Sequence, residues 1–359
     1  MKVKEKSKKW LIAALALALV ILTACAGIII YVDPYFHYHA PISGLYYELD
    51  NERSQNDGII KHFEYDGMII GTSMAENFKT SEAEELFGGT FIKVPFAGGT
   101  YKEQNDNIAN AIEANPNLKT VIRPLDYAYL MDDPDRVRDD LGSYPDYLYD
   151  NNPFNDVNYI FNKDILFNIC LPMLQHTNSD KKSGITSFDD YANWMDEVEF
   201  GADVVLGDRT EYKSPESVQP FVDEVKEMVE ANITQNVTDL AKANPDVDFY
   251  YYLTPYSIAW WGSQVELGNA NRWIEAEKYA IELMLECDNI HLYSFNNEFD
   301  ITTNLDNYSD ECHHGEWINT QNLAWIYSGT DELTAENYED YIAVEKDFYL
   351  NYDYNSLIR

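Results

Sequence analysis

The residues best suited to joint chemistry are a serine near the start of the chain and an aspartate–histidine pair near its end. The segment NYSDECHHGEW (residues 307–317) has Asp310 and His313 at positions i and i+3. At this spacing the carboxylate can hold one imidazole nitrogen, which leaves the other free to take a proton from a serine hydroxyl. These residue types therefore suit the activation of a serine as a nucleophile.

The candidate serine is Ser73, in the segment GTSMAENF (residues 71–78). This segment directly follows the apolar run GMIIG, so Ser73 should lie where a strand ends and a helix begins. There the hydroxyl would point into the crevice at the edge of a sheet, and the helix N-terminus would polarise it. The alternative is that Ser73 only caps this helix.

Two neighbours of His313 offer alternative assignments. His314 follows Glu311 at the same spacing, although the carboxylate is carried on a longer side chain. Cys312 is a thiol beside the proposed base, poorly placed for in-line transfer, and more simply read as a packed small residue. We favour His313 as the base.

Short apolar runs alternate with amphipathic stretches along the chain. Continuous apolar runs of this length are typical of strands buried on both faces, as in a parallel sheet. The expected strands are residues 67–71, 91–96, 120–125, 248–253 and 290–295, and the expected helices are residues 81–87, 102–115, 216–243 and 270–286.

This alternation predicts right-handed crossovers and a flavodoxin-like α/β/α sandwich around a mainly parallel five-stranded sheet. In such a sheet the strand ends open at one rim, so Ser73 and His313 can meet although they are far apart in sequence. Residues 132–215 break the rhythm with many Asp, Asn, Tyr and Pro residues, and we expect an insertion there, above that rim.

The N-terminus predicts a membrane anchor. Residues 1–9 form a basic tail, and residues 10–32 are an uncharged apolar run long enough to cross a ~30 Å hydrocarbon core. The lysines before it favour a cytoplasmic N-terminus and an extracytoplasmic body over residues 33–359. The alternative is a lipoprotein modified at Cys25 in LTAC, but the apolar run continues beyond Cys25.

Composition limits the partners. A net charge of −37 repels polyanions, so we expect no nucleic-acid partner. The four cysteines indicate no disulfide framework. We expect no metal or cofactor, since His37 and His39 are only two possible ligands and residues 300–311 lack the glycine and spacing of an EF-hand calcium loop.

Several motifs together resemble the SGNH/GDSL hydrolase superfamily. They are GTSM after the first strand, a glycine in PFAGGT (residues 95–100) and Asp-x-x-His near the C-terminus. Within it, VDPYFHYHAP and PYSIAWW (residues 255–261) look closest to membrane-anchored bacterial envelope proteins. Those are similar in outline to the D-alanyl transfer protein of teichoic-acid modification and the alginate O-acetyltransferases. The resemblance covers roughly residues 33–359.

The resemblance implies that Ser73 is the nucleophile, His313 the general base and Asp310 the residue that orients it. It also implies an oxyanion hole from the backbone N–H of Ser73 and of Gly98 or Gly99. The third block of the family usually offers an asparagine donor, but here RPLDYAYL has Asp126. Either a protonated Asp126 donates, or Asn77 or Asn56 substitutes, or the activity is modest.

The function that follows is an extracytoplasmic serine esterase or O-acyltransferase. Its substrates would be acylated envelope glycans or small esters, with a multi-pass membrane protein as a possible acyl donor. The alternative is a non-catalytic SGNH-like module that binds glycan or a partner protein. Asp126, in place of the usual asparagine donor, favours this alternative.

Overall fold

A computed structural model describes residues 2–138 and 145–358, with side chains from Lys6 onward. The chain divides into two compact units. Unit 1 comprises residues 1–63 and 143–187, and unit 2 comprises residues 64–142 and 188–359. The predicted insertion at residues 132–215 is thereby shared between the units, and its residues 139–144 lie outside the described part.

A six-stranded sheet forms the centre of unit 2. Its order is β3-β2-β4-β6-β7-β8, and all neighbours are parallel except β7 and β8. The first five strands have the flavodoxin-like order 2-1-3-4-5 when numbered along the chain. The fold class is therefore confirmed. The strands are β2 Gly67–Ile69, β3 Phe91–Lys93, β4 Thr120–Leu125, β6 Asp248–Leu253, β7 Ile290–Ser294 and β8 Glu332–Leu333.

The parallel strands are mainly apolar on both faces because helices cover both, although Lys93 and Arg123 are also buried there. Ile69, Ile122 and Tyr252, on three different strands, form a core with α4 and α15. Val121 and Leu292 are also buried, at strand positions that alternate with those of this core. The helices of unit 2 are α3 Ser73–Glu76, α4 Thr80–Phe87, α5 Tyr101–Ala114, α9 Ala202–Leu206, α10 Asp223–Ile233, α11 Asp239–Ala243, α12 Ile258–Glu266, α13 Ala270–Met284, α14 Phe299–Thr302, α15 Glu316–Ser328 and α16 Tyr338–Asn351.

Two details differ from the sequence prediction. The antiparallel strand β8 was not predicted, because two residues carry no readable periodicity. The helix predicted over residues 216–243 begins only at Asp223, since Pro220 interrupts the segment before it. It also passes through a π-helical turn at Thr234–Thr238 before α11.

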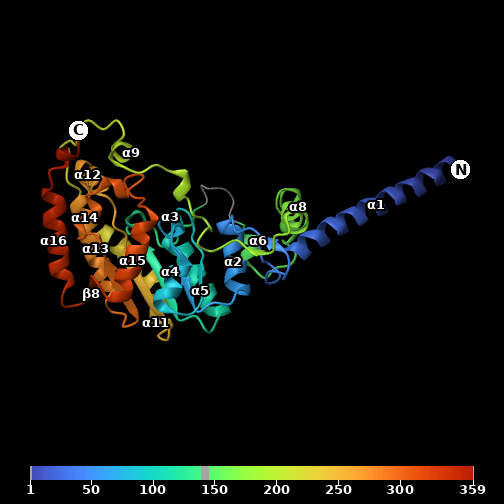
Figure 1. The fold of residues 1–359 in the computed structure, drawn as a ribbon, viewed down its shortest axis with the longest axis horizontal. Coiled ribbons are helices and arrows are strands. Elements are labelled where there is room, and N and C mark those ends of the chain that lie inside the picture. The colour runs from blue at the N-terminus through green and yellow to red at the C-terminus, as the bar shows by residue number, and fades with distance from the viewer. Residues whose placement is uncertain (1, 139–144, 359) are drawn as a thin grey trace. The chain divides into compact units, whose positions relative to one another are not determined.

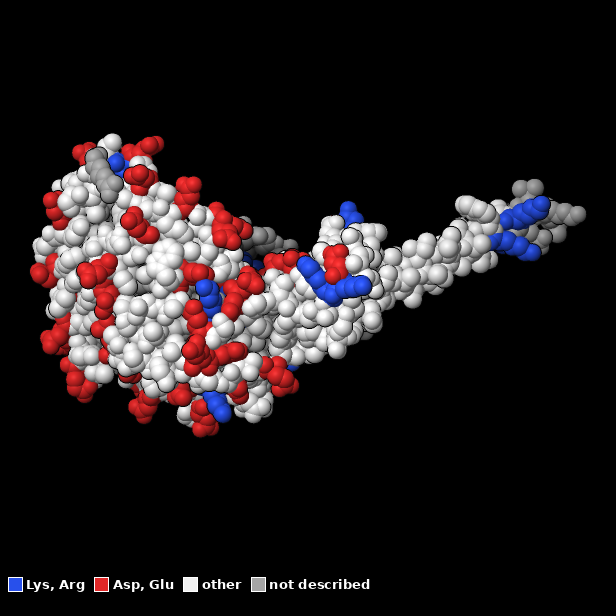
Figure 2. Space-filling model, in the orientation of Figure 1, with Lys and Arg blue, Asp and Glu red and all other residues white. Residues whose placement is uncertain are grey.

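Unit 1 contains the long helix α1 Lys2–Val32 and a small group of short elements, seen beside its C-terminal part in Figure 1. These are α2 Glu52–His62, α6 Asp146–Tyr149, α7 Val157–Ile160, a π-helical turn Ile165–Cys170, α8 Leu171–Asn178, and the parallel strand pair β1 Tyr46–Tyr47 and β5 Gly184–Ile185. Residues Lys6–Val32 of α1 form a helix long and apolar enough to span a membrane. Figure 2 shows this helix without charged groups between its basic start and unit 1.

A buried carboxyl pair joins α13 to α16 in unit 2. Glu277 and Glu345 are fully buried and hydrogen-bonded to each other, and the hydroxyl of Tyr127 donates to Glu277 Oε2 at 2.5 Å. Burial raises the pKa of Glu277 to about 7, and burial together with the charge of Glu277 raises the pKa of Glu345 well above its ordinary value. The folded protein therefore holds protons there that the unfolded chain releases.

This pair predicts that stability falls as pH rises. Below about pH 4.5 both carboxyls are protonated in both states, so stability does not change with pH there. Between about pH 4.5 and 7 the unfolded chain has released the proton of Glu277 that the folded protein still holds, and Glu345 keeps its proton well above its ordinary range. We expect Glu345→Gln to flatten this decline and to raise the free energy of unfolding at pH 8 by about 1–3 kcal/mol. The measurement is thermal unfolding across pH, with Glu339→Gln, an exposed position on the same helix, as the control. An unchanged pH dependence in Glu345→Gln would contradict a shared proton.

Candidate active site

Ser73 lies at the turn from β2 into α3. Thr72 caps α3, because its Oγ1 accepts the backbone N–H of Met74 at 3.2 Å, and Ser73 is the first helical residue. The turn needs Gly71, since a Cβ there would lie 2.7 Å from Pro124 Cγ and 2.8 Å from Ala75 Cβ. The first N–H groups of a helix have no intrahelical acceptor, and within the described part of the chain the backbone N–H of Ser73 has no other acceptor, so it can bind an anion.

His313 and Asp310 come from the loop after β7 and α14. The Oγ of Ser73 lies 2.7 Å from Nε2 of His313, and Nδ1 of His313 lies 2.6 Å from Oδ2 of Asp310. The other oxygen of Asp310 accepts the backbone N–H groups of Cys312 and His313, both at 2.7 Å. These two bonds fix the carboxylate, so the histidine ring is held in one orientation.

The carboxylate raises the basicity of the histidine. Burial by itself lowers the pKa of His313, but the hydrogen bond and charge of Asp310 outweigh it, Asp126 adds to the rise, and the pKa ends above its ordinary value. Burial acts to raise the pKa of Asp310, but its bonds with His313 lower the pKa by more. The pair therefore suits proton transfer near neutral pH, with Asp310 ionised.

The two neighbouring residues are placed differently. His314 is buried, and desolvation lowers its pKa to about 4, so it stays neutral. Glu311, its possible partner by spacing, instead accepts the hydroxyl of Ser263 at 2.5 Å. Burial raises the pKa of the Cys312 thiol well above its ordinary value, so the thiolate needed for attack does not form.

Gly98 and Gly99 form a turn beside the end of β2. The backbone N–H of Phe96 donates to Gly71 O at 2.8 Å, so the chain after β3 runs level with the chain leading to Ser73. Gly98 has a φ of +61° and a Cβ there would lie 2.5 Å from Arg138, so only glycine fits without strain. The N–H of Gly99 donates to Phe96 O at 2.6 Å, while the N–H of Gly98 has no acceptor among residues 2–138 and 145–358.

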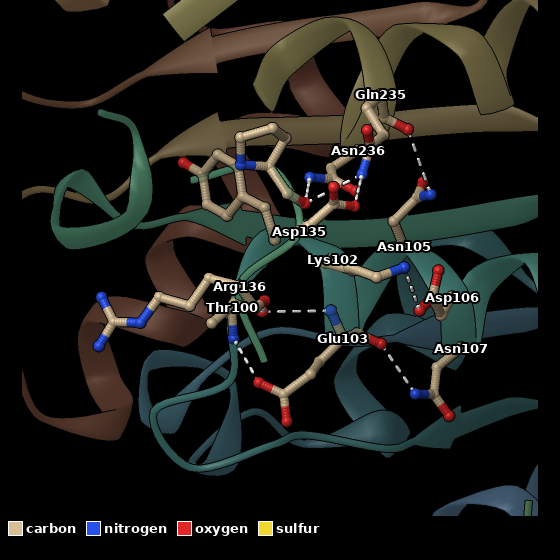
Figure 3. A network of polar contacts seen from close by, with 12 residues as sticks. Thr100, Lys102, Glu103, Asn105, Asp106, Asn107, Asp135, Arg136, Gln235 and Asn236 are labelled. Atoms are coloured by element: carbon tan, nitrogen blue, oxygen red, sulfur yellow. Dashed lines mark hydrogen bonds and ion pairs between the residues drawn. The ribbon is translucent and has the colours of Figure 1, made fainter. Parts of the chain in front are cut away.

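Polar contacts surround this turn, and Figure 3 shows those that begin at Thr100, directly after it. Thr100 and Glu103 form a capping box at the start of α5, and Thr100 Oγ1 donates to Arg136 O at 2.6 Å. The carbonyl of Gly98 accepts the hydroxyl of Tyr129 at 2.6 Å and Nη1 of Arg138 at 3.0 Å. These two bonds fix the peptide between Gly98 and Gly99, whereas the N–H of Gly98 belongs to the preceding peptide, between Ala97 and Gly98.

Asn77 ends α3, one helical turn after Ser73. Its Oδ1 accepts the backbone N–H of Trp194 at 3.0 Å, which fixes the orientation of the amide. Its Nδ2 is buried and has no acceptor within the described residues. Residues at i and i+4 lie on the same helix face, about 5–6 Å apart. A buried amide donor without a partner therefore lies close to the serine.

Asp126 follows β4 and is buried. Its Oδ2 accepts the hydroxyl of Thr72 at 2.6 Å, and its Oδ1 accepts the hydroxyl of Tyr256 at 2.7 Å. Desolvation raises its pKa, and both hydroxyl donors oppose this rise because they stabilise the carboxylate. Asp126 thus serves as an acceptor that ties the cap of α3 to the chain after β6.

Trp194 and Tyr256 are neighbours of the site that sequence reasoning did not single out. The indole of Trp194 packs edge-on against His313 with ring centroids 5.7 Å apart, and its Nε1 donates to Ser73 O at 3.4 Å. Trp194 lies in the segment 188–215, far in sequence from both Ser73 and His313, and no sequence pattern predicts its contact with them. Tyr256 lies within PYSIAWW, and this motif is the sequence feature that could have indicated its place near the site.

The remaining candidates lie in unit 1. Asn56 is buried on α2. His37 lies 3.4 Å from Asp156, whereas the ring nitrogens of His39 contact the carbonyl oxygens of Ala40 and Ile30. The two histidines therefore contact separate partners and do not converge on one point.

Comparison with known proteins gives little further guidance. No protein-family model matches the chain, and no curated protein matches it. Among solved structures, a chain from Streptococcus pneumonia provisionally described as a platelet activating factor is similar at 12% sequence identity and a TM-score of 0.35. The likeness covers 81% of this chain and 90% of that one, and at this TM-score it supports no inference about activity.

Proposed function

We propose that this protein is a serine esterase or O-acyltransferase that works through an acyl-enzyme. The observation that supports this most is the continuous hydrogen-bonded chain from Ser73 Oγ through His313 to Asp310, at 2.7 and 2.6 Å. The resemblance to SGNH/GDSL hydrolases, based on separate motifs, assigns the same roles to these residues. Catalysis is favoured over a binding module because binding alone does not require this chain.

The proposed reaction has two steps. Ser73 Oγ attacks the acyl carbonyl carbon as His313 Nε2 takes its proton, and the imidazolium then gives that proton to the departing alcohol. In the second step His313 removes a proton from water or an acceptor hydroxyl, which attacks the acyl-enzyme and releases Ser73. Asp310 stabilises the imidazolium formed in both steps.

Three donors are suitable for the oxyanion. They are the backbone N–H of Ser73, the backbone N–H of Gly98, and Nδ2 of Asn77, whose buried amide lacks an acceptor among the described residues. The N–H of Gly99 is less suitable because it already binds Phe96 O. Asp126 is proposed as a positioning residue, since both its carboxylate oxygens accept hydroxyl donors.

The proposed substrates are acyl esters of envelope glycans or small esters. An inside N-terminus on α1 would place unit 2 outside the cytoplasm, where such glycans are found. The acidic residues spread over the visible face of unit 2 in Figure 2 disfavour strongly anionic polymers. Transfer in place of hydrolysis would require a bound acceptor, and a multi-pass membrane protein is a suitable class of acyl donor.

The pH dependence of ester cleavage tests this proposal. We expect the full chain in detergent to cleave p-nitrophenyl acetate at a rate that rises with pH, with its midpoint above about 6.5 because Asp310 raises the pKa of His313. Asp310→Asn removes that influence, so the midpoint should move to lower pH and the maximal rate fall by roughly 10⁴-fold.

Asp306→Asn, an exposed carboxylate in the same loop region, is the matched control and should keep the wild-type profile. Cleavage that follows hydroxide concentration alone, with no midpoint and no loss in Asp310→Asn, would contradict the proposed mechanism.

A further inference from the structure

Unit 1 exposes a group of large apolar side chains, here called the apolar face. Its members come from α7, the π-helical turn and the residues around them, and all lie between positions 154 and 171. They are Phe154, Val157, Phe161, Phe167 and Leu171, with exposed fractions of 87%, 49%, 50%, 61% and 38%. Exposed apolar groups gathered over so short a segment mark an interaction surface.

The spacing of these residues forms two helical stripes. Val157 and Phe161 are separated by four residues, as are Phe167 and Leu171, so each pair lies on one side of its helix. The opposite side of the second helix is buried through Ile165, Cys170 and Met173. The exposed stripe is therefore additional to the core of unit 1 and is not required to build it.

The apolar face is continuous with the membrane-spanning candidate. A groove joins the outer part of α1 to the segment that carries the face. It is lined by Leu22, Cys25, Ile29, Ile160, Phe161, Asn162, Lys163, Leu166 and Phe167. Phe161 and Phe167 thus line the same groove as residues that lie inside the apolar run of α1.

The surroundings of the apolar face depend on how deep in the bilayer the neighbouring part of α1 lies. With a hydrocarbon core of ~30 Å beginning at Trp10, a rise of ~1.5 Å per residue puts its outer boundary near Ile30. Leu22 and Ile29 then lie within the outer leaflet. Side chains that line one groove with them must lie at a similar depth, and Lys163 in the same lining can extend its ammonium towards phosphate groups.

Hydrogen bonds join the end of α1 to the part of unit 1 that carries the apolar face. Asp33, directly after α1, is buried and its carboxylate accepts the backbone N–H of Tyr38 at 2.7 Å and the hydroxyl of Tyr159 on α7 at 2.7 Å. Tyr38 in turn donates to Asp156 at 3.0 Å. The end of α1 and the segment that carries the face are therefore fixed to each other.

From this geometry we infer that the apolar face is a second membrane contact, inserted among the acyl chains of the leaflet from which α1 emerges. Its occupant is phospholipid, because the face continues the lipid-exposed surface of α1 at the same depth. The part of unit 1 beyond α1 would then lie against the bilayer surface and not at the end of a flexible tether. This inference is independent of the proposed enzymatic activity.

An apolar carbene photolabel tests the inference on the unaltered full chain. The protein is reconstituted in vesicles of phosphatidylethanolamine and phosphatidylglycerol, irradiated with the label, and mapped by mass spectrometry. We expect Phe161, Phe167 and Leu171 to be labelled at least ~tenfold above Val218 and Val344, exposed apolar residues of unit 2, because the label partitions into hydrocarbon.

The double variant F161Q/F167Q provides a second readout, since both side chains are exposed and their replacement should leave the fold intact. Labelling of Val157 and Leu171 should fall in this variant while labelling of Leu17 and Leu19 on α1 stays unchanged. Label confined to α1 in the wild-type protein, with the apolar face at the level of Val218, would overturn the inference and assign the face to a protein partner.

Discussion

The His313→Ala protein is expected to lose ester cleavage by about 10⁴-fold or more, because removal of the base leaves Ser73 with its proton. The His314→Ala protein is expected to keep activity within about tenfold, since that ring is buried and neutral and its Nδ1 lies beside the carbonyl oxygen of Gly315. The measurement is kcat/KM for p-nitrophenyl acetate for both variants of the full chain.

The stability of the two histidine variants has to be measured separately from their activity. Loss of the buried His314 ring should cost about 1–3 kcal/mol, so the thermal midpoint of that variant should fall, whereas the partly exposed His313 should matter less. A His314→Ala protein that is folded and inactive, beside an active His313→Ala protein, would reverse the assignment of the base.

The second large effect is expected at Asn77. Asn77→Ala removes a proposed oxyanion donor and should reduce kcat by about 10²–10³-fold with a smaller change in KM. The reason is that the donor binds the charge that develops in the transition state more strongly than the neutral ester.

Asn77→Asp separates catalysis from structure. Aspartate keeps an oxygen that can accept the N–H of Trp194, but it no longer donates to an oxyanion. We expect Asn77→Asp to be as slow as Asn77→Ala. Near wild-type kcat in Asn77→Asp would mean that Asn77 only holds Trp194 in place.

Much of the fold could be predicted from the sequence because its strands are buried on both faces. Runs such as TVIRPL (residues 120–125) and DFYYYL (residues 248–253) are mainly apolar, and helical segments with clear periodicity lie between several of the strands. The apolar run of residues 10–32 likewise predicts a membrane-spanning helix, and α1 includes this run in a helix long and apolar enough to cross a membrane. Strand β8 is too short to leave such a pattern.

Less of the candidate site than of the fold could be predicted from the sequence. The meeting of Ser73 with His313 follows from strand order, because both lie after strands of one parallel sheet. The approach of Trp194 depends on how an irregular segment folds back, and no local pattern encodes this. The role of Asp126 depends on the hydroxyl groups of Thr72 and Tyr256, which approach it from two other strand ends.

The central claim is that Ser73 is a nucleophile activated by His313. Its most direct test is labelling of the full-length protein in detergent with a fluorophosphonate probe, followed by mapping of the modified residue. We expect one adduct, on Ser73, that is lost in Ser73→Ala and strongly reduced in His313→Ala. A folded wild-type protein that the probe leaves unmodified would contradict the claim.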